Sequence, residues 1–90
     1  MKIYWRAEAR ADLEQLLDYI AAESMSGAAR VMDRILTRVE SLAELPRLGR
    51  PGRRPDIREL VIVSTPYIVV YRLGAEEIEI LVVLHGAQLR

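Results

Sequence analysis

The spacing of apolar side chains changes once along this 90-residue chain, and no other feature restricts its fold more. Before residue 46 the apolar residues recur at helical spacing, whereas after residue 59 they alternate or run together, as in strands. A chain of this length has room for one hydrophobic core. We therefore expect one domain over residues 1–90, in which helices pack against a sheet.

The helical part divides into two amphipathic segments. The first has apolar positions at i, i+3, i+4 and i+7, namely Leu13, Leu16, Leu17 and Ile20. This pattern predicts a helix from about Ala7 to Glu23. A break at residues 24–27 follows, with Ser26 as the expected N-cap of a second helix. The apolar face of that helix is formed by Val31, Ile35, Val39, Leu42 and Leu45. Because the break is short, the two helices should form an antiparallel hairpin.

Strands are expected on both sides of the hairpin. A short β-branched and aromatic run predicts one at Lys2–Trp5. Three more are predicted at Leu60–Val63, Tyr67–Leu73 and Ile78–Leu84, joined by short turns that favour an antiparallel meander. Residues 80–84, ILVVL, are apolar on both faces and belong in the sheet centre. The stretch 47–56, RLGRPGRRPD, is predicted to be a loop by its glycines and prolines.

This order of elements predicts an α+β fold. It consists of an N-terminal strand, an antiparallel helical hairpin and a three-stranded antiparallel meander, which together make one twisted sheet. If the first strand lies beside Ile78–Leu84, the two strands are parallel. The helices then supply the crossover that a parallel pair requires.

Composition excludes several kinds of site. The chain has no cysteine and one histidine, so we expect no disulfide, no metal site and no cofactor. The N-terminal residues lack the apolar run of a signal peptide, and no segment approaches the ~20 apolar residues of a membrane span. We expect a cytoplasmic protein without membrane association.

Charge is balanced overall, with 13 basic and 13 acidic residues, so the molecule has no general attraction to nucleic acid. Residues 47–60 differ, because five arginines stand there against Asp56 and Glu59. Two interpretations of this basic segment remain open. Its arginines either keep an exposed loop hydrated or contact an acidic partner.

Six short motifs follow one another along the chain. They are A-x-x-D-L at Ala9–Leu13, the pair Tyr19 and Ile20, L-P-x-L-G-R at Leu45–Arg50, R-E-L at Arg58–Leu60, Y-x-V-V-Y-R at Tyr67–Arg72, and V-L-H-G at Val83–Gly86. Their order and spacing resemble those of the RelE/ParE toxin family. Together they cover nearly the whole chain. The resemblance implies a bacterial toxin that is encoded beside a small antitoxin, which wraps around the toxin and silences it.

Two activities occur in that family. RelE-like members are metal-independent nucleases that cut messenger RNA on the ribosome and use basic side chains for phosphate stabilisation and proton transfer. ParE-like members poison DNA gyrase by binding it, and need no catalytic residues.

The nuclease pattern is incomplete in this chain. The catalytic arginine that directly follows the first tyrosine of the third strand is replaced by Ile68. The basic residue expected after Gly86 is replaced by Ala87 and Gln88, and the nuclease's terminal tyrosine would lie beyond residue 90. Only Arg58 matches a basic residue of the nuclease's second strand. We therefore expect no catalytic residues and a toxin that binds gyrase. The alternatives are a ribosome-dependent mRNA endonuclease and a non-toxic binding domain.

The expected partners are a ParD-like antitoxin with a ribbon-helix-helix DNA-binding part, and DNA gyrase. DNA itself would be contacted only through the antitoxin complex. Candidate residues for contacting target or antitoxin are Arg50, Arg53, Arg54, Arg58, Arg72, His85, Gln88 and Arg90. For His85 a structural hydrogen bond is expected rather than catalysis. A disordered antitoxin can bind as a helix in an apolar groove, for which the candidates are Leu13, Leu17, Ile20 and Val39, or pair with an open strand edge.

Overall fold

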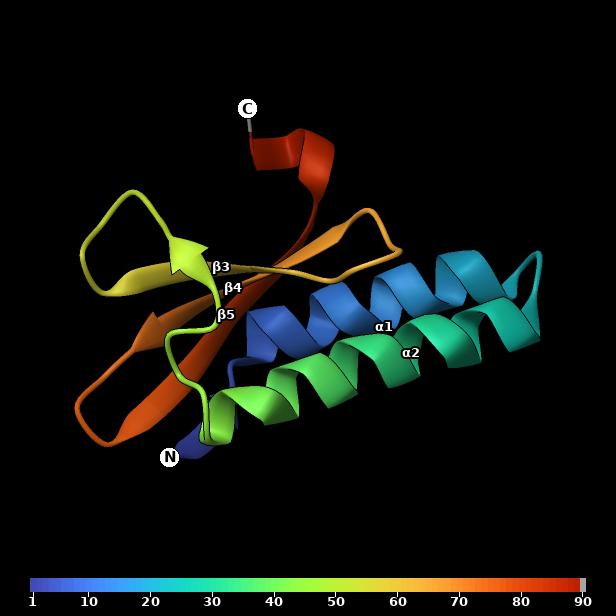
Figure 1. Cartoon of the computed structure of the whole chain (residues 1–90). Coiled ribbons are helices and arrows are strands. Elements are labelled where there is room, and N and C mark those ends of the chain that lie inside the picture. Colours follow the sequence, from blue (N-terminus) through green and yellow to red (C-terminus); the bar gives the residue numbers. More distant parts are fainter. Residues whose placement is uncertain (90) are drawn as a thin grey trace.

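The computed structural model describes residues 1–89 and has the predicted α+β architecture. In chain order its elements are β1 (Lys2–Trp5), α1 (Ala7–Ala21), α2 (Met25–Glu40), the short 3-10 helix η1 (Ser41–Ala43), β2 (Arg50–Pro51), β3 (Ile57–Val61), β4 (Tyr67–Leu73), β5 (Glu77–His85) and the 3-10 helix η2 (Gly86–Leu89). The helices α1 and α2 form an antiparallel hairpin that lies against the sheet (Figure 1). Within the described residues, no helix has the length and apolarity to cross a membrane.

The strands form one sheet in the order β1-β5-β4-β3-β2. β1 runs parallel to β5, with Ile3 opposite Ile78, and the other neighbours are antiparallel. The predicted parallel pair and the predicted meander are therefore both confirmed. β5 is an interior strand with neighbours on both sides, while the middle position belongs to β4.

Three details at the helix and strand ends differ from the predictions. The strand predicted at Leu60–Val63 is β3 at Ile57–Val61, because pairing with β4 already begins at Ile57 opposite Arg72 and Val63 lies in the turn that follows. Ser24, and not Ser26, is the N-cap of α2, because its extended backbone lets its Oγ accept the Gly27 N–H at 2.9 Å. β2 was not predicted, since prolines and glycines surround it and it is only two residues long. It pairs through Arg50 opposite Glu59 and Pro51 opposite Arg58, at the edge of the sheet, where proline is tolerated.

The core lies between the helices and one face of the sheet. Fully buried side chains come from the first helix (Ala9), the second (Ile35, Val39), η1 (Leu42) and the strands (Leu60, Val69, Tyr71, Ile78, Ile80). β4 and β5 lose register at one point, where Val70 faces Val82 but Tyr71 faces Ile80. The intervening Leu81 is thus the extra residue of a β-bulge. The bulge shifts the buried face of β5 from residues 78 and 80 to residue 83.

The hydroxyl of Tyr71 fixes the loop between η1 and β2 to the sheet. It donates a hydrogen bond to the Pro46 carbonyl (2.7 Å) and accepts one from the Gly49 N–H (2.9 Å). Arg58 of β3 adds Nη1 bonds to the Gly49 carbonyl (2.6 Å) and to the Arg47 carbonyl (3.3 Å). A Cβ at position 49 would lie 2.7 Å from Cε1 of Tyr71 and 3.0 Å from the Glu59 carbonyl oxygen, so this contact requires glycine.

Burial raises the pKa of Tyr71, while the Gly49 N–H and the charge of Arg58 oppose the shift. The raised value means that the folded protein holds the phenolic proton more tightly than the unfolded chain does. This contribution to stability is therefore complete below the ordinary tyrosine value of 10.0 and is lost as pH rises above it.

We predict that Tyr71→Phe lowers the free energy of unfolding at pH 8 by about 1–3 kcal/mol, because the Gly49 N–H and the Pro46 carbonyl lose their partner. In a domain of this size each 1 kcal/mol corresponds to a melting temperature lower by about 4–8 °C. Urea unfolding at pH 8 and pH 11 should show the difference between the two proteins shrinking at the higher pH. Tyr19→Phe, at an 81% exposed position, is the control and should change little. An equally small loss for both variants would contradict the role of this hydroxyl.

Candidate functional site

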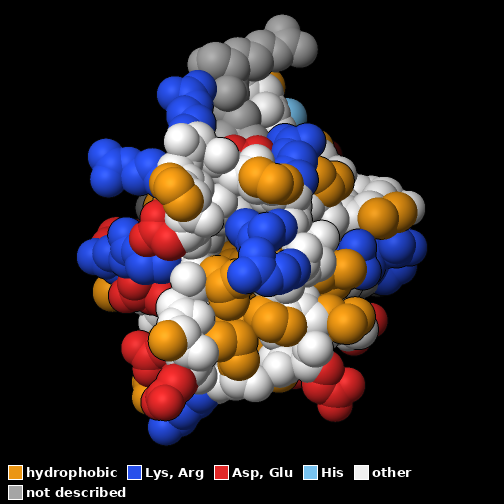
Figure 2. Space-filling view, turned by 60° about the vertical axis from the view of Figure 1, so that its left-hand side comes forward, with side chains coloured by type: hydrophobic (Ala, Val, Ile, Leu, Met, Phe, Trp, Pro, Cys, Tyr) orange, Lys and Arg blue, Asp and Glu red, His pale blue; other side chains and the backbone are white. Residues whose placement is uncertain are grey.

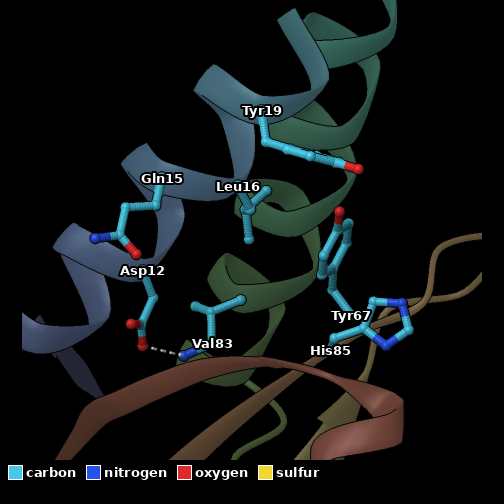
Figure 3. Close-up of a pocket in the computed structure, with 7 residues that line it drawn as sticks. All are labelled: Asp12, Gln15, Leu16, Tyr19, Tyr67, Val83 and His85. Atoms are coloured by element: carbon cyan, nitrogen blue, oxygen red, sulfur yellow. Dashed lines mark hydrogen bonds between the residues drawn. The ribbon is translucent and has the colours of Figure 1, made fainter.

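A cleft of about 540 Å³ opens between α1 and the ends of β4 and β5 (Figure 3). It is lined by Asp12, Gln15, Leu16, Tyr19, Tyr67, Val83 and His85. The cleft exists because β1 is short. Its last residue, Trp5, lies opposite Ile80, and the chain then turns into α1. Beyond Ile80, no described strand pairs with this edge of β5.

Side chains of the cleft accept hydrogen bonds from backbone N–H groups at the end of β5 and just after it, where β1 no longer pairs with β5. The Asp12 carboxylate accepts the Val83 N–H at 2.9 Å, where a neighbouring strand would otherwise bind (Figure 3). At the end of β5, the Nδ1 atom of His85 accepts the Ala87 N–H at 3.2 Å, as expected for a structural histidine. The rings of Tyr67 and His85 make an edge-to-face contact, with their centroids 6.0 Å apart. The cleft thus combines a fixed carboxylate with aromatic walls, a lining suited to binding part of another molecule.

Of the five described arginines that were predicted to contact a partner, three have partners within the chain. Arg50 pairs with Glu59 at 2.9 Å, and Arg72 pairs with both Asp56 (3.2 Å) and Glu79 (2.7 Å). As described above, Arg58 bonds to carbonyls of the loop before β2. These three arginines therefore contribute to the architecture, and surface ion pairs of this kind add little stability individually.

Arg53 and Arg54 are different, because both are exposed and neither makes an ion pair with any residue of the part described, 1–89. They lie in the loop between β2 and β3, at the left of Figure 1. Figure 2 shows this end of the molecule, where basic side chains form separate groups with apolar side chains between them. The basic segment of the sequence is thus a scattered set of charges, of which Arg47, Arg53 and Arg54 are exposed and make no ion pair within residues 1–89.

The position of the nuclease arginine is apolar and covered. Ile68 is 7% exposed, and a Cβ built on Gly86 would lie 3.7 Å from its Cδ1 atom. The N–H of Gly86 donates to the Pro66 carbonyl at 2.6 Å, which fixes the start of η2 over this strand. Gln88 lies in η2, and Arg90 lies outside the described residues.

The predicted groove residues do not form one surface. Val39 is 2% exposed and belongs to the core, so its assignment to a partner groove was wrong. Its helical spacing could not show that the sheet already covers this face. Leu13 also packs against the core and is only partly buried. Leu17 and Ile20 keep partial exposure near the end of α1 and remain candidates.

Sequence reasoning missed the cleft beside α1. Asp12 and Tyr19 belong to quoted motifs, and Tyr67 begins another, but no role was assigned to any of them. The signal was present in the motifs themselves. The sequence did not reveal the register of β1 on β5, in which Trp5 lies opposite Ile80 and the edge of β5 beyond Ile80 is left to α1.

Comparisons with known proteins agree with this architecture. Residues 3–90 match the model of the family described as ParE toxin of the type II toxin-antitoxin system, parDE. The chain is 44% identical over 87 residues to Y4kP of Sinorhizobium fredii (strain NBRC 101917 / NGR234), covering 97% of this chain and 90% of that protein. It is 36% identical over 88 residues to Toxin RelE2 of Caulobacter vibrioides (strain ATCC 19089 / CIP 103742 / CB 15), covering 98% of each.

A solved structure shows the same fold. The structure titled "Chromosomal ParDE TA system from P. aeruginosa" has a TM-score of 0.83 and 27% identity, and the match covers 94% of this chain and 95% of that one. The family match over almost the entire chain and the shared fold lead to one conclusion. The protein belongs to the ParE toxin family and is the toxin of a ParDE-type toxin-antitoxin system, which implies an antitoxin partner.

Proposed function

We propose that this toxin inhibits DNA gyrase by binding it directly, and that a ParD-like ribbon-helix-helix antitoxin neutralises it. The proposal places both interactions in the cytoplasm, with DNA contacted only through the antitoxin complex. One observation carries the choice of a binding mechanism over RNA cleavage. The position that holds the nuclease arginine is Ile68, an apolar side chain that is 7% exposed and cannot stabilise a phosphate.

The surface chemistry supports a protein target. Exposed arginines at positions 53 and 54 can pair with carboxylates of a partner. The aromatic side chains of the cleft beside α1 can take up an apolar or aromatic anchor. The arginines are scattered, whereas binding along a nucleic-acid backbone favours a continuous basic stripe.

Purified toxin, freed from its antitoxin, should inhibit supercoiling by purified DNA gyrase and trap a cleavage complex. Adding the antitoxin should restore supercoiling, because it binds the same toxin. Topoisomerase I relaxation assayed in parallel serves as the control for a general effect on DNA. Unchanged supercoiling with no trapped complex at saturating toxin would refute the proposal.

A ribosome-dependent mRNA endonuclease is the second candidate, and the names of two Caulobacter vibrioides relatives, Toxin RelE2 and Toxin RelE3, favour testing it. Primer extension on messenger RNA after induction would reveal it as cuts at fixed codon positions. We expect no such cuts, because the chain has isoleucine at position 68. A non-toxic binding domain, the third possibility, would leave growth unaffected when expressed without antitoxin.

We predict that Arg53→Glu combined with Arg54→Glu weakens binding of the antitoxin or of gyrase by at least about tenfold, or ~1.4 kcal/mol. Both side chains are exposed and lack internal ion pairs within residues 1–89, so the reversal acts on the partner rather than on the fold. Arg30→Glu, on the exposed face of α2, is the matched control. Isothermal titration calorimetry measures both variants. Equal affinities for the double variant and the control would show that this loop is only solvated.

A further inference from the structure

The side chains that α1 contributes to the cleft lie in a row along one side of the helix. Asp12, Gln15, Leu16 and Tyr19 follow one another at i, i+3, i+4 and i+7, the spacing that places residues on one face. The ends of β4 and β5 form the opposite wall (Figure 3). Since seven residues of α-helix span about 10 Å, a long side chain of another molecule can lie along this groove.

The cleft has a negative charge that no described cation neutralises. Among the described residues that line it, none is a lysine or an arginine. Asp12 makes no ion pair with any residue of 1–89. The Nδ1 atom of His85 accepts the Ala87 N–H, and a nitrogen that accepts a hydrogen bond carries no proton, so this imidazole is uncharged. The charge of the cleft therefore favours a cationic ligand.

The Asp12 carboxylate is fixed in position and keeps most of its capacity to accept hydrogen bonds. Its Oδ2 atom accepts the Val83 N–H at 2.9 Å, which holds the group against the end of β5 (Figure 3). The two oxygens of a carboxylate can accept about four hydrogen bonds. A guanidinium group has parallel N–H groups that match a carboxylate, so it is the cation best suited to the remaining positions.

The rest of the lining suits the stem of an arginine. Figure 3 shows the apolar side chains of Leu16 and Val83 between Asp12 on one side and Tyr19 and Tyr67 on the other. An arginine side chain has an apolar stem that ends in a charged, planar head. When the head lies at Asp12, the stem covers the two apolar residues, and the tyrosines lie beside the backbone of the bound segment. A purely apolar ligand would instead bury the carboxylate without a partner.

We propose that this cleft binds an arginine side chain of the protein on which the toxin acts. The guanidinium group pairs with Asp12, and the amide oxygen of Gln15 accepts a further N–H. Tyr19, which is 81% exposed, covers the bound segment, in keeping with the prominence of tyrosine among residues that dominate binding. Lysine fits less well, because its ammonium is a point charge without the planar pair of donors.

This inference rests on the proposed function in one respect, namely that the toxin acts by binding a protein. It identifies the apolar anchor of that partner as the stem of an arginine. A nucleic acid does not fit the cleft, because its phosphates and Asp12 are both negatively charged.

The first test titrates the full chain with N-acetyl-arginine amide and with N-acetyl-citrulline amide, in which an uncharged urea group replaces the guanidinium group. ¹⁵N-NMR should show saturable shifts at residues 12–19 and 83–87 with the arginine probe, and at least about tenfold weaker binding of citrulline. Asp12→Asn keeps an oxygen for the Val83 N–H and should lose this preference. Asp18→Asn removes an exposed charge of α1 outside the cleft and should retain it.

The second test uses purified DNA gyrase and the same two variants. Asp12→Asn should need at least about tenfold more toxin than the unaltered chain for half-inhibition of supercoiling, because the arginine of the target loses its carboxylate. Asp18→Asn should match the unaltered chain. If the unaltered toxin does not inhibit gyrase but prefers arginine to citrulline, gyrase is refuted as the target while the ligand chemistry of the cleft is supported.

Several outcomes would overturn the proposal. They are the absence of saturable shifts with the arginine probe, equal binding of arginine and citrulline, and equal effects of Asp12→Asn and Asp18→Asn. If Asp12→Asn weakens binding of the antitoxin and leaves gyrase inhibition unchanged, the cleft belongs to the antitoxin and the proposed occupant is wrong. If Asp12→Asn does not fold, the comparison of the two probes on the unaltered protein still decides.

Discussion

The hydrogen bonds of the Tyr71 hydroxyl hold together parts of the chain that the sequence keeps far apart. Through this buried group, β4 binds both ends of the loop at Pro46 and Gly49, and Arg58 clamps the same loop from β3. Gly49 is required because any side chain would meet the tyrosine ring. Three of the family motifs therefore meet at one point, where they maintain the scaffold.

The arginines of the motifs also make contacts within the chain. Other surfaces of the molecule are therefore left to bind a partner. Arg50, Arg58 and Arg72 make contacts within the chain, whereas Arg47, Arg53 and Arg54 are exposed and make no ion pair among the described residues. The two openings in the sheet have a common origin in its short outer strands. β1 has four residues beside the nine of β5, and β2 has two beside the five of β3. Each short strand leaves part of its neighbour uncovered. The edge of β5 beyond Ile80 borders the cleft beside α1, and the edge of β3 is uncovered beyond Glu59.

The sequence predicted the fold well because its periodic signals are strong and mutually consistent. The helical hairpin, the meander and the parallel pairing of the first strand all follow from apolar spacing and chain reversal. The failures occurred where the signal was short or non-local. β2 is too brief to have a period, and the N-cap at Ser24 depends on backbone geometry. The burial of Val39 depends on how the helices pack over the sheet, and the cleft around Asp12 depends on the register of β1 along β5. Side-chain spacing encodes neither.

The scaffold role of the shared motifs can be measured at one atom. Hydrogen exchange of the Gly49 amide reports directly on its bond to the Tyr71 hydroxyl, although Gly49 lies in a loop. If the motif residues hold the loop to the core, this amide exchanges as slowly as that of Val69 in the central strand, through opening of the whole molecule. Exchange as fast as that of the exposed amides of Arg53 and Arg54 would show that the loop opens on its own, and would contradict a scaffold built around Tyr71.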